Sequence, residues 1–252
     1  MSISIIDNET CLNCRKETCA FIDVVAKRGT LFLSEGTVCP TGVLQSNPAT
    51  MQSNPFSKRE CIDCGLCVGY CNKSNLTISD TEKDINIKNC SSLGLNALVS
   101  NYLNKIFLFA ANSNRNSSVL FDAYVELDKE KEAFVEVDEK DSLECCRNLL
   151  SDFLLYEGQF SKEVNTGLIV LKEFPKKGSS SVFGVIEKMH LFPKLETKQI
   201  YFTTFLFLKY LFLNNLDKNV DFEKLFFNPV QESFDDYADR ILTVLGFDFN
   251  CV

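Results

Sequence analysis

Four cysteines within residues 61–71 have a spacing that suits an inorganic cluster. They follow the pattern C-x2-C-x2-C-x3-C and are Cys61, Cys64, Cys67 and Cys71. Thiolates spaced in this way bind cube-shaped 4Fe-4S clusters, because a short loop can curl around the cube and offer it several sulfurs. Gly65 and Gly69 suit such a curl, since glycine allows a positive φ and a close approach of the backbone. We therefore expect this loop to bind a 4Fe-4S cluster.

A second group of cysteines lies upstream of this run. Its members are Cys11, Cys14 and Cys19, spaced C-x2-C-x4-C, and Cys39, which is followed by Pro40. In two-cluster proteins the fourth cysteine of the central run ligates the other cluster, so a second set of ligands is expected. With these motifs, residues 1–91 resemble a bacterial two-cluster 4Fe-4S ferredoxin.

The resemblance implies a ligand set for each cluster. One cluster would be held by Cys11, Cys14, Cys19 and Cys71, and the other by Cys39, Cys61, Cys64 and Cys67. The chain departs from the ferredoxin pattern in two additional residues before Cys19 and at Asn72, where proline is expected. Cys90 lies in the same region, so Cys71 and Cys90 are alternatives for one ligand position.

Cysteines can also bind zinc or form disulfide bonds. Paired C-x2-C units bind zinc tetrahedrally, although a zinc ribbon rarely has a third cysteine two residues further on and a fourth after three more. Disulfides need an oxidising compartment, and residues 1–7 have neither the basic region nor the long apolar stretch of a secretory signal. We therefore expect reduced cysteines and a cytoplasmic location.

The distribution of cysteines predicts two domains. Eight of the twelve cysteines of this 252-residue chain lie between Cys11 and Cys71. Bound metal can stabilise a domain that has little hydrophobic core, whereas the remainder must bury a core of its own, for which the 22 phenylalanines provide material. We expect a cluster domain at residues 1–91 and a second domain at residues 92–252.

Charge and hydropathy limit the partners of the chain. The net charge is −8 and the pI about 4.9, so no overall positive field attracts nucleic acid or an anionic membrane. The most apolar window, residues 199–213, is shorter than the roughly 20 residues that a bilayer requires and contains Lys209. We expect a buried or partner-facing helix there and no membrane contact.

The pattern of apolar residues predicts the elements that position these groups. In the first domain we expect a strand within residues 1–10, a hairpin over 29–38 and strands at 75–79 and 84–88. In the second we expect helices near 92–104, 142–157, 196–216 and 231–245, and strands at 105–110, 118–127, 133–138 and 166–171. The predicted apolar face of the helix at 142–157 consists of Leu143, Cys146, Leu149, Leu150, Phe153 and Leu154.

Residues 92–172 therefore have the element order α-β-β-β-α-β, which resembles the core of the PD-(D/E)XK nucleases. That resemblance implies Mg²⁺ or Mn²⁺ held by acids on the second and third strands, with a lysine two residues after the second acid. Asp122 and Glu136 occupy the acidic positions, and Asp138 stands at the lysine position. Lys140 shares a strand face with Glu136 and could replace that lysine, because side chains alternate with period two. The alternative is that residues 136–141 are the solvated end of a hairpin.

The predicted fold class is α+β, a ferredoxin-like two-cluster domain followed by an α/β domain with additional C-terminal helices. Three functions remain open at this point. The chain could carry electrons or sense redox state for its second domain or a protein partner. It could instead be a divalent-metal-dependent DNA nuclease with structural or regulatory clusters, or a non-catalytic iron-sulfur subunit of a larger complex. The sequence thus leaves open whether the chain is an enzyme. His190, the one histidine, is predicted to be a surface residue after a helix.

Overall fold

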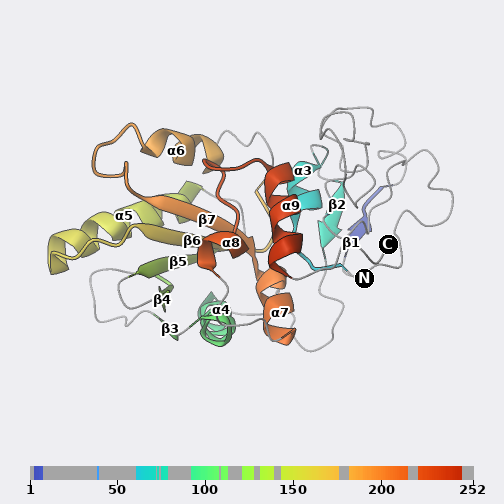
Figure 1. Ribbon diagram of the computed structural model, residues 1–252, viewed down its shortest axis with the longest axis horizontal. Helices are drawn as coiled ribbons and strands as arrows, with labels where there is room; N and C mark the ends of the chain where they lie inside the picture. The colour runs from blue at the N-terminus through green and yellow to red at the C-terminus, as the bar shows by residue number, and fades with distance from the viewer. Residues whose placement is uncertain are drawn as a thin grey trace.

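The computed structural model has an α+β fold in which helices surround a five-stranded mixed sheet (Figure 1). The structure describes residues 3–7, 39, 61–71, 73, 75–78, 92–107, 109–112, 121–127, 131–138, 143–175, 182–214 and 221–245. Several predicted features lie outside these residues. They are the hairpin at 29–38, the strand at 84–88, and the side chains of Cys11, Cys14, Cys19, Cys90 and Lys140.

From β5 to α7, strands and helices alternate along the chain. The strands are β1 (Ile3–Ile5), β2 (Leu76–Ile78), β3 (Phe109–Asn112), β4 (Ala123–Glu126), β5 (Glu132–Asp138), β6 (Thr166–Leu171) and β7 (Gln199–Thr204). The helices are α3 (Leu66–Tyr70), α4 (Ser92–Ile106), α5 (Leu143–Phe160), α6 (Val182–Met189), α7 (Phe205–Leu213), α8 (Phe222–Leu225) and α9 (Phe234–Val244). The predicted order α-β-β-β-α-β is observed from α4 to β6.

The large sheet has the strand order β3-β4-β5-β6-β7. Strands β3, β4 and β5 run antiparallel, whereas β5, β6 and β7 run parallel. Asp138 pairs with Leu171, and Leu171 pairs with Thr204, so the carboxyl ends of β5, β6 and β7 lie along one edge of the sheet. Figure 1 shows α6 above this sheet and α4 and α7 below it. The parallel strands are mostly buried, as expected for strands covered on both faces.

Two predicted elements differ from the structure. The helix predicted at 196–216 begins as strand β7, and α7 follows it directly at Phe205. Thr204 marks the change, because its hydroxyl caps α7 by accepting a hydrogen bond from the N–H of Phe207 at 3.1 Å. The strand predicted at 105–110 is also wrong in its first half, since α4 continues to Ile106 and β3 begins only at Phe109.

Helix α5 confirms the predicted helix and extends it to Phe160, and Cys146, Leu149 and Phe153 of the predicted apolar face are buried. Its buried residues are Cys145, Cys146, Leu149, Asp152 and Phe153. Leu143 and Leu154, predicted for the apolar face, are 48% and 40% exposed. The buried face includes a carboxylate because Asp152 packs beside the acidic group of the sheet, described below.

The small sheet confirms the strand predicted near the start of the chain. Strand β1 pairs antiparallel with β2, and Ile3 lies opposite Ile78. The side chain of Asn75 fixes the end of this pair, accepting a hydrogen bond from the N–H of Asp7 at 2.9 Å and donating one to its carbonyl oxygen at 2.6 Å. The strand pair therefore continues directly from the cysteine loop, which ends only four residues before Asn75.

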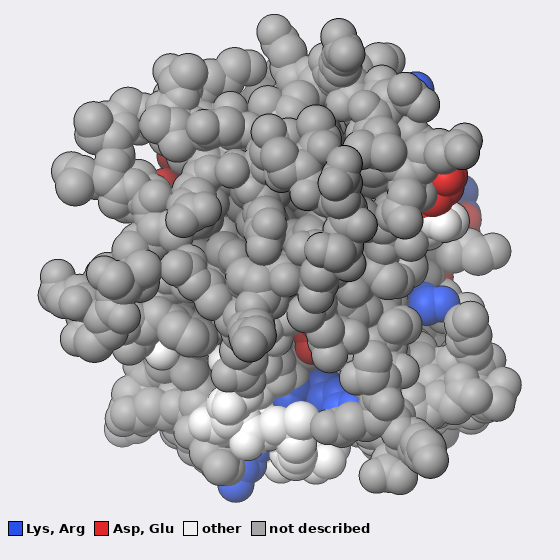
Figure 2. Space-filling view, turned by 90° about the vertical axis from the view of Figure 1, so that its right-hand side faces the viewer, with Lys and Arg blue, Asp and Glu red and all other residues white. Residues whose placement is uncertain are grey.

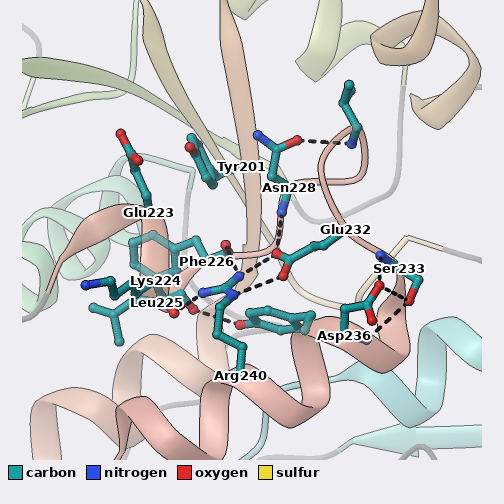
Figure 3. Close-up of polar contacts among 12 residues, drawn as sticks. Tyr201, Glu223, Lys224, Leu225, Phe226, Asn228, Glu232, Ser233, Asp236 and Arg240 are labelled. Atoms are coloured by element: carbon teal, nitrogen blue, oxygen red, sulfur yellow. Dashed lines mark hydrogen bonds and ion pairs between the residues drawn. The ribbon is translucent and has the colours of Figure 1, made fainter. Parts of the chain in front are cut away.

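A polar network holds the C-terminal helix against the rest of the chain (Figure 3). Arg240 on α9 donates hydrogen bonds to both carboxylate oxygens of Glu232 and to the backbone carbonyls of Lys224 and Phe226. Tyr237 lies beneath the guanidinium group and donates from its hydroxyl to the carbonyl of Leu225 at 2.8 Å. The start of the helix is fixed by a capping box between Ser233 and Asp236.

The described cysteine segment and the sheet share one hydrophobic core. Ile62, Leu66 and Val68 are fully buried in it together with residues of β5, β6, β7 and α9. The rings of Tyr70 and Phe234 pack edge to face, with 6.3 Å between ring centroids. The predicted boundary near residue 91 thus separates two segments whose side chains pack together. Among the described helices, none combines the length and apolar character needed to cross a bilayer.

Candidate functional site

The cysteine loop has two residues with a left-handed backbone. Asp63 has a φ of 54° and Gly65 a φ of 80°, and the loop then enters the short helix α3 at Leu66. This sharp turn folds the chain back, so that Cys64 and Cys67 are both buried. A positive φ is easy for glycine but rare for other residues, which explains the choice of residue at position 65.

Four thiols gather at this loop. They belong to Cys39, Cys61, Cys64 and Cys67. Burial raises the pKa of Cys64 and Cys67 well above the usual thiol value, and the charges of Cys39 and Cys61 raise both further. Cys39 is therefore brought from a distant part of the chain to within electrostatic reach of the central run.

Backbone N–H groups of α3 lie near two of these sulfurs. The N–H of Leu66 bonds to the sulfur of Cys64 and acts to lower its pKa. The N–H of Val68 donates to the carbonyl of Gly65 at 3.0 Å and has only a small lowering effect on the pKa of Cys67. Hydrogen bonds of this kind favour the charged thiolate, the form that ligates metal. Four thiols with nearby N–H donors are the kind of ligand set that a 4Fe-4S cluster requires, and the cluster itself stays a prediction.

Cys71 lies at the far end of α3. It is buried, and its sulfur accepts a hydrogen bond from the N–H of Asn75 at 3.4 Å. Its charge is not among the main influences on Cys64 and Cys67, unlike that of Cys39. The predicted partners of Cys71 lie outside the described residues, so its assignment to the other cluster stays a prediction.

The loop packs against the carboxyl ends of β6 and β7. A Cβ atom placed on Gly65 would lie 2.6 Å from Cγ2 of Thr204, and one on Gly69 would lie 2.7 Å from the carbonyl oxygen of Pro175. Both glycines also contact the ring of Phe174, so neither position has room for a side chain. Figure 2 views the molecule from this end, and the described charged groups visible there are both basic and acidic.

The structure also brings together carboxylates at the predicted acidic positions. Asp122 precedes β4, and its Oδ2 accepts a hydrogen bond from the N–H of Val137 at 2.9 Å while Oδ1 accepts one from the Asn96 side chain on α4. Glu136 on β5 is 6% exposed, so the predicted alternative of a solvated hairpin end is wrong for this residue. Lys140, Glu139 and Asp141 lie outside the described residues, and Asp138 is half-buried.

Burial controls the ionisation of this group. Loss of solvation raises the pKa of Glu136 to about 10, and the charges of Asp122 and Asp152 add to the effect. The same loss of solvation raises the pKa of Asp122, although its two hydrogen bonds oppose the rise. Burial and the neighbouring charges therefore favour one proton shared between Glu136 and Asp152 at neutral pH, while Oε1 of Glu136 has no hydrogen-bond partner in the described part of the chain.

Sequence reasoning did not identify Asp152 or Asn96 as neighbours of these acids. Asp152 is 5% exposed on α5, and its position three residues after Leu149 on the buried face was the one signal that could have found it. Asn96 on α4 had no such signal, because a polar residue on a helix is usually solvated. Within the described residues, no three His, Cys, Asp or Glu side chains are close enough to hold a single metal ion, and this is true of the thiols of the cysteine loop as well as of these acids.

The remaining predicted positions have ordinary surroundings. Cys146 is fully buried on α5, which confirms its predicted packing role. Its neighbour Cys145 is also buried, and loss of solvation, together with the charges of Glu136 and Asp138, raises its pKa far above the usual thiol value. His190 is exposed directly after α6, as predicted.

Comparison with known proteins adds no relative to these observations. No family model matches the chain, and neither does any curated protein or solved structure.

Proposed function

We propose that this chain is an iron-sulfur protein that transfers electrons or senses redox state for its own sheet domain or for a protein partner. One 4Fe-4S cluster would be held by Cys39, Cys61, Cys64 and Cys67, and a second by Cys11, Cys14, Cys19 and Cys71. The observation that carries the proposal is the gathering of four thiols, one from far away in the chain, around backbone N–H donors.

The electrostatics of the loop support bound iron. Buried thiolates without a neighbouring positive charge are costly, as the raised pKa values of Cys64 and Cys67 indicate. Iron ions would supply that positive charge. When bound, a 4Fe-4S cluster exchanges one electron at a time at a potential set by burial and by hydrogen bonds to sulfur. Leu66 would provide one such bond through its N–H group.

The test is to measure iron and acid-labile sulfide in anaerobically purified protein and to record its EPR spectrum before and after reduction. Two clusters predict about eight iron and eight sulfide per chain, and reversible one-electron reduction. Cys64→Ala should lose about half of the iron, whereas Cys146→Ala, a buried thiol on α5, should keep all of it. Zinc without labile sulfide, or equal iron in both variants, would refute the proposal.

A second candidate is a metal-dependent nuclease activity of the sheet domain. It is favoured by the observed element order from α4 to β6 and by the electrostatic contact of Asp122 with Glu136. A divalent ion held by such acids could polarise a phosphodiester and activate water. Asp138 at the lysine position argues against this function.

Plasmid cleavage tests this candidate. Supercoiled DNA is incubated with the protein and Mg²⁺ or Mn²⁺, using Asp122→Asn, Glu136→Gln and the surface control Glu187→Gln on α6. A nuclease requires cleavage by the wild type and the control, and its loss in the other two variants. No cleavage by the wild type, or equal cleavage by all four proteins, would remove this candidate.

A further inference from the structure

The last residue of β7 contacts both the cysteine loop and helix α7. Thr204 is 1% exposed, and its hydroxyl donates a hydrogen bond to the carbonyl of Asp63 at 2.9 Å. The same hydroxyl oxygen accepts the hydrogen bond from the N–H of Phe207 that caps α7. One side chain thus connects the loop between two cysteines with the start of a helix 141 residues further along the chain.

Asp63 has an unfavourable backbone conformation, which the hydrogen bond from Thr204 helps to stabilise. Its φ of 54° is uncommon for a residue with a side chain, and it lies between Cys61 and Cys64. Its carboxylate accepts a hydrogen bond from the sulfur of Cys61 at 3.4 Å. A bond that fixes the backbone of Asp63 therefore also fixes the directions in which the two neighbouring sulfurs point.

Helix α7 continues the contact toward the acidic group. Phe205 and Phe212 of α7 pack on Tyr102 of α4, with ring centroids 5.5 and 4.9 Å apart. On the same helix α4, Asn96 donates to Asp122. Thr204, helix α7 and helix α4 thus connect the cysteine loop with the carboxylates.

We propose that Thr204 is a positioning residue that fixes the shape of the cysteine loop and transmits its state to α7. This inference rests on the proposed iron-sulfur function. With iron bound, the loop is held by its sulfurs, and the carbonyl of Asp63 stays in place for Thr204. After removal of iron the loop loosens, the bond to Asp63 weakens, and the cap of α7 loses its fixed acceptor.

Two readouts test the proposal on the full-length protein. The first is the reduction potential and EPR spectrum of the bound cluster, and the second is hydrogen exchange at the N-terminal amides of α7, with iron present and after anaerobic chelation. In the wild type we expect chelation to speed exchange of the Phe207 amide about tenfold, the factor that corresponds to about one hydrogen bond.

Three variants separate the role of the hydroxyl from that of packing. Thr204→Val keeps the shape but removes both hydrogen bonds, so it should shift the potential and give fast α7 exchange with iron present. Thr204→Ser should restore both properties. Thr203→Val is the matched control, because the Thr203 hydroxyl is equally buried on the same strand but has no hydrogen-bond partner among the described residues. It should behave as the wild type.

The outcomes are distinct from those of the proposed function. Absence of iron and sulfide from the wild type would remove the iron-sulfur function itself. Wild-type protein that contains clusters, but whose α7 exchange is the same with and without iron, would overturn only the role of Thr204. The same conclusion would follow if Thr204→Val had the potential of the wild type, or if Thr203→Val changed both readouts as much. The wild-type comparison holds even if Thr204→Val does not fold.

Discussion

The molecule has two clusters of buried ionisable side chains, the thiols of the cysteine loop and the carboxylates around Glu136. In both clusters burial opposes the charged form, but the clusters differ in what can neutralise the charge. At the thiols, burial raises the pKa of Cys64 and Cys67, and iron is the neutralising charge that we propose. At the carboxylates, a proton on Glu136, shared with Asp152, serves that purpose. The cluster of thiols is also largely built by one loop. The cluster of carboxylates instead uses residues from four places in the chain, namely α4, β5, α5 and the position directly before β4.

The largest effect is expected at Gly65, where the shape of the loop is tested. Gly65→Ala forces a side chain onto a left-handed backbone and toward Thr204, which cannot move because two hydrogen bonds hold it. We expect a loss of about 3 kcal/mol in the free energy of unfolding. Chemical denaturation measures this loss, and iron analysis should show reduced cluster content.

Gly184 provides the control for this substitution. It lies within α6, and a Cβ atom there would meet no atom of the described residues within 4 Å. Gly184→Ala should stabilise the protein by about 0.5 to 1 kcal/mol, because alanine has the higher helix propensity. If both alanine variants had the same stability, the thiol loop would not depend on its local shape.

The next effect concerns the proton on Glu136. Between the ordinary carboxyl pKa and about 10, the folded protein retains this proton and the unfolded chain releases it. The stability contributed by the proton is therefore complete at acidic pH and is lost as the pH rises through this window. From pH 6 to pH 8 the wild type should lose about 2 kcal/mol more than Glu136→Gln, which keeps an uncharged hydrogen-bond donor.

Urea unfolding at the two pH values measures this difference. Glu187→Gln changes the same charge on the exposed face of α6 and should follow the wild type. If Glu136→Gln showed the same pH dependence as the wild type, Glu136 would not be the protonated group. The proposed contrast between the two sites would then be wrong.

The smallest effect is expected at Arg240, which holds helix α9 in its place against the cysteine loop. Arg240 holds α9, whose Phe234 packs on Tyr70 of α3. Arg240→Lys cannot reproduce the forked hydrogen bonds to Glu232 and to the backbone carbonyls, so we expect a loss of about 1 kcal/mol in denaturant unfolding. Arg147→Lys changes an exposed pair with Glu144 and should change stability by less than about 0.5 kcal/mol. Equal losses would show that the network at Arg240 contributes no special support.

The sequence predicted best those features whose signal is local. Helix α5 was recognisable from the period of its apolar residues, and β5 and β6 from short apolar runs between polar turns. In contrast, residues 199–213 are apolar almost throughout, so no period showed that β7 ends and α7 begins at Thr204. The capping preference of threonine was the remaining clue, but it was hidden within an apolar run.

The two candidate sites differ in the same way. The spacing of Cys61, Cys64 and Cys67 predicted a binding loop, because all three side chains come from one turn of the chain. Asp152 meets Glu136 only because α5 packs on β5, and that register depends on the tertiary fold. The burial of Glu136 was likewise not visible in the sequence, since an acid near a strand end is usually solvated.

The contact between Asp63 and Thr204 also has a consequence for biosynthesis. On the ribosome, the cysteine loop emerges long before β7 and α9, the elements that cover it in the finished protein. Iron delivered during translation would thus meet an uncovered loop, open to oxygen and to competing metals. Delivery after release of the chain would instead have to reach thiols that are already enclosed. Under the proposed function, the order of translation and iron delivery would therefore decide whether maturation needs an assisting factor that keeps the loop open.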